Sequence, residues 1–305
     1  MTRENTSFWF DPAAQPVVTA VSGEELIVET QDAHSGTITG ADVVYSTFDD
    51  VMDRIGGANP VTGPVAIEDV VPGDLVSIEI IHVEGAPVTG FGYMNTTPTL
   101  RPEFAAETTI CHRRGDKVEI PTRRGAVLVP YRPFIGTLGL APKQDKLLSF
   151  SQSSEVMGNV DLPDLAAGAQ VVIRANVEGG LVSLGDAHLA QGDAEIHRSA
   201  IETQADVTLR VTNLGSEGAI YENLPQINTD LAIGSVAPGP GHLEDLVRAA
   251  YDDLALRLHR GHGFSLPDAY RLLGAVGTIR IGQVVPPVFS ALARIDRSYL
   301  EETHN

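Results

Sequence analysis

The sequence predicts an α+β fold in which β structure dominates. Thirty glycines and nineteen prolines are scattered over 305 residues, and they separate many short segments of alternating apolar and polar side chains, a pattern typical of β-strands. A strand–turn–strand pattern recurs three times, whereas helical spacing of apolar residues is confined to the last third of the chain. We therefore expect repeated units to form a β-sandwich-like core, with two C-terminal helices packed on a β-sheet.

The three units are recognised by turns at Gly23, Gly73 and Gly168. Superposing these glycines aligns the apolar residues of the strands that follow, as expected for a sandwich built by repetition. The aligned positions are Leu26, Val76 and Val171, then Val28, Ile78 and Ile173. The same register places Asp32 and His82 at equivalent strand ends, where a titratable side chain can point into a site. Any glycine turn before a strand would look similar, and a histidine that ends a strand often has only a structural role.

The middle of the chain continues the β pattern. Residues 132–142 contain two glycines within an apolar run, which indicates a bulge or a close approach of the backbone. Residues 147–159 are polar and rich in serine, so we expect a surface loop. Residues 177–188 form a predicted strand that leads into an acidic motif, and residues 205–211 alternate as a half-buried strand.

The C-terminal third changes to helical periodicity. Apolar residues at helical spacing predict a helix over about residues 242–260, and glycines at 261 and 263 end it. Ser265 and Asp268 have the spacing of an N-terminal cap for a second helix through about residue 275. An apolar tail over 284–295 predicts a last edge strand. No linker is visible, so we expect one domain over 1–305, with β-rich halves at 1–150 and 151–235 and a helical part at 236–305.

Composition excludes several classes of function. The net charge of −19 and the isoelectric point near 4.7 argue against a nucleic-acid partner, since binding phosphates needs clustered basic residues. No apolar run is long enough for a membrane span, and the N-terminal residues do not resemble a signal peptide. The single cysteine excludes an internal disulfide and an all-thiolate zinc site. We expect a cytoplasmic protein.

Familiar nucleophile and nucleotide motifs are absent. The chain has no Gly-x-Ser-x-Gly elbow, no His-Glu-x-x-His, no phosphate-binding Gly-x-x-x-x-Gly-Lys-Ser/Thr and no Gly-x-Gly-x-x-Gly after a strand. Ser151, Ser153 and Ser154 have no supporting lysine or histidine nearby, so a loop role is expected. Cys111 is followed by His112, but a lone cysteine in a β-rich chain is usually a packing residue.

The strongest functional signal is the acidic motif at 185–195. It contains Asp186, His188, Gln191, Asp193 and Glu195, with glycines directly before both aspartates. In extended backbone, side chains at i and i+2 share a face, so Asp186 should point with His188 and Asp193 with Glu195. Such a cluster is costly unless a cation or bound protons offset the repulsion. The alternative is a pair of glycine–aspartate turns with solvated acids.

Mixed carboxylate and imidazole ligation suits a divalent ion, with Zn²⁺ expected first and Mn²⁺, Mg²⁺ or Ca²⁺ as other candidates. Such an ion lowers the pKa of bound water to near neutral. Glu195 is the first choice for taking the proton and returning it to a leaving amine, and Asp193 is a further catalytic candidate. Gln191, His82 and His34 are candidate substrate-binding or supporting residues.

Six collinear motifs make the chain resemble the acetamidase/formamidase family along nearly its whole length. They are Asn59-Pro-Val-Thr-Gly-Pro-Val65, Val71-Pro-Gly-Asp74, Arg132-Pro-Phe-Ile-Gly136 with 139–142, Gly158-Asn-Val-Asp161, the acidic motif, and Ile281-Gly-Gln-Val-Val-Pro-Pro287. The resemblance implies a β-rich α+β fold, hydrolysis of short amides to a carboxylate and ammonia, and a divalent metal. It also implies a homodimer or higher homo-oligomer.

The resemblance also implies site residues. Asp186, His188 and Glu195 fall in the family's acidic motif, Asp32 in its early strand end, and Asn159 with Asp161 in its Gly-Asn-x-Asp loop. We therefore expect Asp32, Asp186, His188 and Glu195 at the metal, Asp161 as a catalytic group and Asn159 as a support. The sequence departs from the family pattern at residues 34–37 and over 91–104, where a differently shaped pocket can arise.

These observations favour metal-dependent hydrolysis of a small linear amide similar to formamide or acetamide, without a covalent nucleophile. Two alternatives stay open at this point. One is a non-catalytic β-sandwich binding module whose acidic motif holds a structural Ca²⁺ ion. The other is a hydrolase of the same fold that acts on a larger C–N substrate, with specificity set by the loops around residues 34–60 and 91–104.

Overall fold

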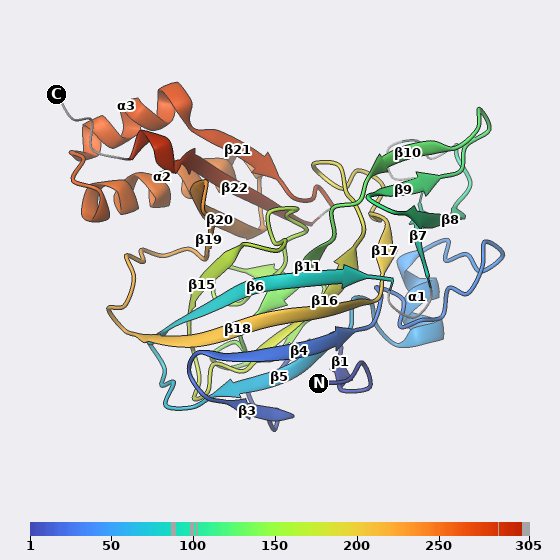
Figure 1. Ribbon diagram of the computed structural model, residues 1–305, viewed down its shortest axis with the longest axis horizontal. Coiled ribbons are helices and arrows are strands. Elements are labelled where there is room, and N and C mark those ends of the chain that lie inside the picture. Colours follow the sequence, from blue (N-terminus) through green and yellow to red (C-terminus); the bar gives the residue numbers. More distant parts are fainter. Residues whose placement is uncertain (87–89, 98–100, 102, 286, 301–305) are drawn as a thin grey trace.

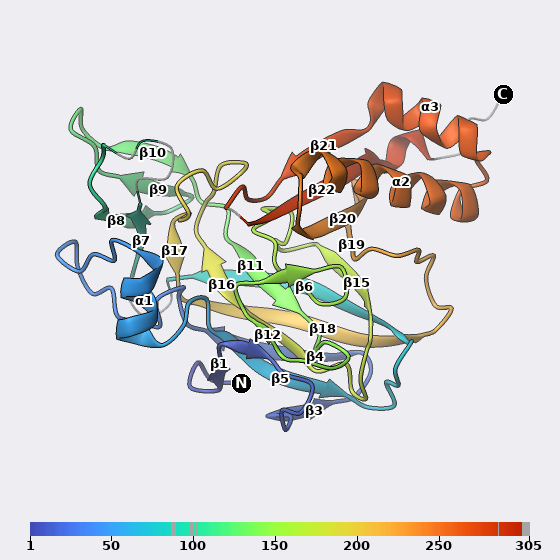
Figure 2. The same cartoon turned by 180° about the vertical axis from the view of Figure 1, so that it is seen from behind.

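A computed structural model describes residues 1–305 apart from 87–89, 98–100, 102, 286 and 301–305. The part of the chain so described forms sheets of twelve, eight and two strands together with three α-helices. Figures 1 and 2 show two of the helices at one end of the molecule and a protruding β-hairpin at the other, with the long strands between them. The predicted β-dominant α+β class is confirmed.

The twelve-stranded sheet follows the order β10-β9-β8-β7-β17-β16-β11-β14-β13, and β5 joins it by pairing with β16, β1 and β3. Its strands are β1 (Thr6–Ser7), β3 (Val18–Ala20), β5 (Val61–Ile67), β7 (Phe91–Thr96), β8 (Glu107–Arg114), β9 (Lys117–Ile120), β10 (Val127–Pro130), β11 (Phe134–Gly139), β13 (Gln152–Ser153), β14 (Met157–Asn159), β16 (Val182–His188) and β17 (Glu202–Thr203). Only β3 and β5 pair in parallel among the described strands.

The eight-stranded sheet has the order β21-β22-β20-β19-β15-β6-β18-β4. Its strands are β4 (Glu24–Thr30), β6 (Leu75–Gly85), β15 (Gln170–Arg174), β18 (Ala205–Gly215), β19 (Gln226–Asn228), β20 (Ala232–Pro240), β21 (Thr278–Ile281) and β22 (Val288–Asp296). A ribbon pairs β2 (Trp9–Phe10) with β12 (Leu147–Leu148). The helices are α1 (Phe48–Ile55), α2 (Leu243–Gly261) and α3 (Leu266–Val276), followed by the 3₁₀ turn η1 (Arg297–Tyr299).

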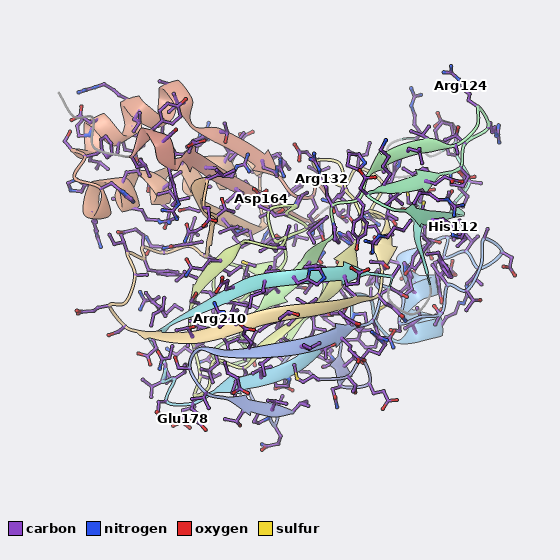
Figure 3. All side chains as sticks on the ribbon, viewed as in Figure 1. His112, Arg124, Arg132, Asp164, Glu178 and Arg210 are labelled. Carbon is purple, nitrogen blue, oxygen red and sulfur yellow. The ribbon has the colours of Figure 1, made fainter. Side chains whose placement is uncertain are left out.

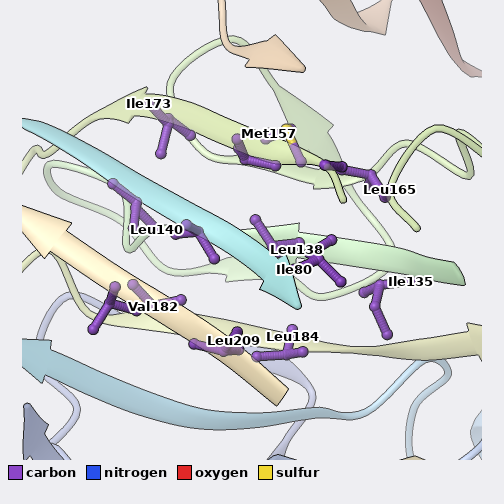
Figure 4. Close-up of a cluster of buried hydrophobic side chains, with 14 of the residues drawn as sticks. Ile80, Ile135, Leu138, Leu140, Met157, Leu165, Ile173, Val182, Leu184 and Leu209 are labelled. Carbon is purple, nitrogen blue, oxygen red and sulfur yellow. The ribbon is translucent and has the colours of Figure 1, made fainter. Parts of the chain in front are cut away.

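Side chains from both large sheets form one buried core. Ile80 and Leu209 from the eight-stranded sheet meet Leu138, Val182 and Leu184 from the twelve-stranded sheet, and all five are inaccessible to solvent (Figure 4). Burying one such aliphatic side chain stabilises the fold by about 1.5–3 kcal/mol. This core is the rigid support on which the strands of the twelve-stranded sheet present polar residues at their ends.

The three predicted turn glycines have the expected conformation. Gly23, Gly73 and Gly168 have φ of +90°, +102° and +90°, a left-handed region that glycine adopts at little cost. The strands that follow them, β4, β6 and β15, all belong to the eight-stranded sheet, whereas β3 and β5 before the first two turns belong to the twelve-stranded sheet. The first two units therefore cross from one sheet to the other, while the residues before Gly168 form only the bridge between Phe134 and Ala166.

The helix α1 lies within residues 34–60, which we expected to be a loop. Its N-terminus has a reciprocal cap, since the Thr47 hydroxyl accepts from Asp50 N and the Asp50 carboxylate accepts from Thr47 N. Gly56, at φ +86°, ends it. The other predicted loop, 91–104, begins as the strand β7, and its residues 98–100 and 102 lie outside the described part of the chain.

Both predicted C-terminal helices are confirmed. Ser265 caps α3 by accepting from Asp268 N, as the sequence indicated. The helix α2 is tied to the sheet by buried Arg257, which donates to Gly234 O at 2.6 Å and to Ser235 Oγ at 3.0 Å. No helix in the described residues is long and apolar enough to cross a membrane.

The sequence predicts an edge strand over residues 284–295, and the structure has a strand there that does not lie at an edge. The strand β22 lies inside its sheet, because it pairs with β20 on one side and with β21 on the other. The short strand β21 forms the edge instead. Residue 286, within the predicted strand, lies outside the described residues.

Candidate active site

The acidic motif leads into a buried cluster of four carboxylates and one imidazole. Donor atoms of Asp161, Asp186 and His188 lie within 4.8 Å of one another, and so do those of His188, Glu195 and Glu202. Within the cluster, His188 Nε2 lies 3.1 Å from Glu202 Oε2 and 3.5 Å from Asp186 Oδ1. Each of the five side chains belongs to a residue that is at most 9% exposed. His188 belongs to both groups, so the two groups adjoin at its imidazole.

Strand pairing assembles this cluster from segments that are distant in the sequence. The strand β11 pairs with β14 and β16, so Thr137 lies opposite both Asn159 and Gly185. The strand β17 pairs with β16 and places Glu202 opposite His188. Opposite side chains in an antiparallel pair share a face, with Cβ atoms about 4.5–5.5 Å apart. Register therefore brings Glu202 to the imidazole, although it lies outside the motif found in the sequence.

Several polar atoms of the cluster have no hydrogen-bond partner among the described residues. They are Oδ1 of Asp161, Oδ1 of Asp186, Oε2 of Glu202 and both ring nitrogens of His188. His188 Nε2 and Glu202 Oε2 are thus close enough for an ion pair, but their geometry is not that of a hydrogen bond. Buried polar atoms are nearly always paired, so these oxygens and nitrogens are available as donors to a cation. The donor set fits a divalent ion with oxygen and nitrogen ligands.

Burial and mutual repulsion shift the pKa values within the cluster. Burial, reinforced by Glu195 and Asp186, raises the pKa of Asp161 well above its usual value. Burial likewise raises the pKa of Glu195 to about 8 and that of Glu202 above its ordinary value. Burial lowers the pKa of His188, but the neighbouring Glu202 and Asp186 outweigh it, so this pKa lies well above the usual value. Burial thus favours the protonated forms of Asp161, Glu195 and Glu202, and binding of a divalent cation would displace such protons.

A chain of amide and hydroxyl groups orients the acids at one side of the cluster. Asn59 Nδ2 donates to Asp186 Oδ2 at 2.6 Å and to Asn159 Oδ1 at 3.1 Å. Asn159 Nδ2 in turn donates to Asp161 Oδ2 at 2.8 Å, and the Thr137 hydroxyl donates to Asn159 Oδ1. The predicted supporting role of Asn159 has a direct structural basis here. Asn59 and Thr137 are further contacts that the sequence did not single out, although Asn59 begins the first family-like motif.

The second half of the acidic motif departs from the predicted geometry. Ala194 and Glu195 have φ of +76° and +43°, so the segment turns instead of extending. As a result Asp193 and Glu195 do not share a face. Glu195 points into the cluster, whereas the Asp193 side chain is 63% exposed and lies 3.3 Å from Arg280. The prediction that these two side chains share a face is wrong, because alternation of faces requires extended backbone.

Gln191 supports the site through the backbone. Its Nε2 donates to Asp161 O at 2.7 Å and to Gly282 O at 3.0 Å. Gln283, from the last family-like motif, donates to Asn159 O at 3.0 Å. Two glutamines thereby join the acidic motif and the C-terminal segment to the loop that carries Asp161.

Asp32 and His34 form a network beside the cluster. Asp32 is not part of either group of converging donors. Its Oδ1 accepts from Tyr93 Oη and from His34 N, both at 2.9 Å. His34 Nδ1 lies 2.9 Å from the same Tyr93 hydroxyl, and Tyr93 is paired across the strands with Glu202. Burial raises the pKa of Asp32 and lowers the pKa of His34 to about 4.

His82 lies on the outer face of the eight-stranded sheet. Its side chain is 61% exposed, with Nε2 3.7 Å from Glu84. The pairing of β6 with β18 skips Ile81, which is an extra residue in β6. Such a bulge reverses the alternation of faces, so His82 does not continue the inward series that ends at Ile80. The structure does not bring it to the cluster.

The other candidate nucleophiles have structural roles. Cys111 is fully buried in β8, and burial raises the pKa of its thiol to about 11. A thiol so protonated is a poor nucleophile. Ser153 accepts a hydrogen bond from Val156 N at 3.2 Å within the loop before β14. Cys111 thus has the expected packing role. The surface loop expected over residues 147–159 is wrong, because this segment contains the strands β12, β13 and β14 and buries Gln152, Val156 and Met157.

A cavity of about 540 Å³ adjoins the cluster through Glu195. The hairpin of β9 and β10 supplies Ile120 and Val129 to its wall, and Arg132 lies beyond the end of β10. Ile201, directly before Glu202, closes another side. A molecule in this cavity therefore has access to the cluster at Glu195.

At Gly136 in β11 the backbone passes close to the acids. A Cβ atom at this position would lie 2.5 Å from Asp161 Oδ1 and 2.8 Å from Asp186 O. Gly136→Ala is therefore expected to displace the acids, to weaken binding of a divalent metal by about 10- to 100-fold and to cost about 1–3 kcal/mol of stability. Metal titration and thermal unfolding measure both effects. Gly274→Ala in α3 is the control, because its Cβ would meet no atom within 4 Å. Unchanged metal affinity in Gly136→Ala would contradict this account.

Comparisons of the sequence and of the structure with known proteins point to the same family. The model of the Acetamidase/Formamidase family matches residues 3–156 and 151–285. An acetamidase from Bacillus halodurans is 27% identical, with 98% of this chain and 97% of that chain covered and a TM-score of 0.88. A predicted acetamidase/formamidase from Thermoanaerobacter tengcongensis is also 27% identical, with 98% and 96% covered and a TM-score of 0.87. An acetamidase from Yersinia enterocolitica is 26% identical, with 99% and 92% covered and a TM-score of 0.87.

A comparison with curated protein sequences found no match. The family match nevertheless covers most of the chain, and the structural likeness extends over nearly all of it. Both agree with the order of motifs in the sequence and with a buried acidic site that has no activated serine or cysteine among the described residues. The chain therefore belongs to the acetamidase/formamidase family and is an amidohydrolase.

Proposed function

We propose that this enzyme hydrolyses a linear primary amide to a carboxylate and ammonia, with a divalent metal ion held by Asp161, Asp186, His188 and Glu202. The observation that supports the ion most directly is the set of buried donor atoms without hydrogen-bond partners. One imidazole among oxygen donors suits a transition metal, and we expect zinc. When bound, such an ion supplies Lewis-acid chemistry by acidifying water and polarising a carbonyl.

We assign the proton transfers to Glu195. It lies in the cluster and also lines the cavity, so its carboxylate can reach both water and substrate. Burial holds its pKa at about 8, close to the pH at which a general base and acid must exchange protons efficiently. Glu195 can take a proton from the attacking water and donate it to the leaving nitrogen, so that ammonia departs as the C–N bond breaks. Asp193, paired with Arg280 at the cavity wall, is a weaker candidate for this step.

Other residues of the chain orient these groups. Asn59 and Asn159 fix Asp186 and Asp161 through the hydrogen bonds described above. Asp32, predicted at the metal, is better placed to hold Tyr93 beside Glu202. His34 contacts the same tyrosine and is kept neutral near pH 7, since burial lowers its pKa to about 4.

The test of the proposal combines metal analysis with ammonia release. Protein purified without added metal is analysed for zinc, manganese, magnesium and calcium, and then assayed with formamide, acetamide and longer amides. We expect a transition metal at about one ion per chain and ammonia release that stops when a chelator removes the ion. Turnover with no amide in the presence of any of these ions would overturn the proposal. Family membership sets aside the alternative of a non-catalytic calcium-binding module.

We also expect the enzyme to form a homodimer or a higher homo-oligomer, as the family resemblance implies. Light scattering coupled to gel filtration measures the molar mass directly. A multiple of 32.4 kDa is expected. A single species at the mass of one chain, at concentrations well above those of the assay, would contradict this expectation.

A further inference from the structure

The cavity beside the cluster is larger than a formamide-like substrate needs. Its volume of about 540 Å³ falls within the range of about 300–1,000 Å³ in which proteins enclose ligands of many atoms. Much of its wall is apolar, from Met94, Ile120, Val129, Ala190, Ile196 and Ile201. An acyl chain of several carbons therefore fits between the wall and Glu195.

Arg132 is the cation in this cavity that has no partner within the described chain. Its guanidinium makes no hydrogen bond and no ion pair there, although Arg132 N donates to Leu189 O at 2.9 Å. By contrast, Arg280 in the same wall is 3.1 Å from Asp164 and 3.3 Å from Asp193. A guanidinium with free donors is the group best suited to bind a carboxylate through two parallel hydrogen bonds.

Arg132 is held at a short distance from the cluster. Its backbone contact with Leu189 follows directly after His188, and Phe134, two residues further on, pairs with His188. Arg132 and Phe134 are two residues apart in the chain, and each residue of extended chain spans about 3.3 Å. The backbone of Arg132 therefore lies roughly two residues along the chain from the position opposite His188. A molecule that places one end at Glu195 and its other end at Arg132 is therefore short.

The surrounding hairpin has a charge opposite to that of the whole protein. Residues 113–132 contain six basic and two acidic side chains, a formal charge of +4, in a chain with a net charge of −19. Figure 3 shows Arg124 at the far tip of this hairpin and Arg132 nearer the centre of the molecule. Local positive charge raises the concentration of anions at a binding site. The positive charge of the hairpin therefore favours an anionic substrate, although the net charge of the whole protein repels anions.

We propose that Arg132 binds a carboxylate at the far end of the substrate, so that the enzyme prefers the monoamide of a short dicarboxylic acid to the uncharged amide of equal chain length. This inference rests on the proposed amide hydrolysis. In the reaction, the oxygen of water forms a bond to the amide carbon and the C–N bond breaks. The nitrogen takes one proton of the water and leaves as ammonia. The other proton of the water is released as the new carboxylic acid ionises, so the second product is the dicarboxylate.

The test compares matched pairs of amides on the same enzyme preparation. Succinamate, glutaramate and adipamate are each paired with the uncharged amide of equal chain length: butanamide, pentanamide and hexanamide. For the best chain length we expect kcat/KM of the charged amide to exceed that of its neutral partner by about tenfold or more. Arg132→Gln should lower this ratio by about tenfold. Arg124→Gln, at the hairpin tip outside the cavity, is the matched control and should change it less than about twofold.

Because the ratio is taken within each variant, a general loss of folding or activity does not affect it. A ratio of one or less at all three chain lengths in the wild type overturns the inference, and so does a ratio that Arg132→Gln leaves unchanged. Calorimetric titration with adipate separates this inference from the proposed function. If no amide is hydrolysed, adipate binding that is lost in Arg132→Gln still supports the carboxylate site, whereas absence of adipate binding to the wild type overturns it.

Discussion

Glu195→Gln is expected to reduce kcat for amide hydrolysis by about 10²- to 10⁴-fold, the usual contribution of a positioned general acid–base group. Glutamine preserves the volume and the hydrogen-bonding reach of the side chain but does not exchange the proton. Since the other members of the cluster still offer their donor atoms, metal content should stay near that of the wild type. Steady-state ammonia release together with metal analysis measures both quantities. A rate within threefold of the wild type would remove Glu195 from the mechanism.

Asp193→Asn is the informative comparison, because both acids come from the same predicted motif. The Asp193 side chain is 63% exposed and paired with Arg280, so its loss should lower kcat much less than Glu195→Gln does. A larger loss in Asp193→Asn would assign the proton transfer to that residue instead.

The pKa of Glu195 provides a second test of the Glu195→Gln variant. In the folded, metal-free protein burial raises this pKa to about 8 from a usual 4.5, so between these values the folded state holds a proton that the unfolded state has released. The free energy of unfolding therefore falls as pH rises through this window. Glutamine does not titrate. Metal-free Glu195→Gln should thus lose less thermal stability between pH 5 and pH 8 than the metal-free wild type.

The fold was predictable because its signals are local. Turn glycines at 23, 73 and 168 require a left-handed backbone that few other residues adopt, and the apolar spacing of α2 extends over five turns. The helix α1 was missed because it is only eight residues long, too short for its apolar spacing to stand out. Its cap, Thr47 with Asp50, was nevertheless visible in the sequence.

The site was only half predictable, because part of it depends on register. Asp186 and His188 were found from their i, i+2 spacing, and both reach the cluster although Asp186, at φ +55°, departs from extended backbone. Glu202 is a single carboxylate between Ile201 and Thr203, and only the pairing of β17 with β16 brings it to His188. The prediction that His82 points into the site is wrong for the converse reason, since a bulge that the sequence does not reveal turns its side chain outward. Long-range pairing and single-residue bulges are properties of the assembled sheet.

The largest effect on metal content is expected from His188→Ala. The imidazole is fully buried and belongs to both groups of converging donors, so its loss removes the nitrogen ligand and the link between the groups. Residues that merely support metal ligands already change affinity by about 10- to 100-fold, and loss of a ligand should exceed this. We expect metal affinity to fall by more than about 100-fold and ammonia release to fall with it.

Removing His188 also removes its edge-on contact with the Phe134 ring, 4.9 Å away between ring centroids, so unfolding must be separated from loss of a ligand. His188→Gln fills most of the volume and tests this, because it should keep the thermal unfolding temperature closer to the wild type and still bind metal poorly. His112→Ala, at an exposed position in β8 (Figure 3), controls for loss of a histidine elsewhere. Full metal content in both His188 variants would mean that oxygen ligands alone hold the ion, as calcium prefers, and the transition-metal assignment would then be wrong.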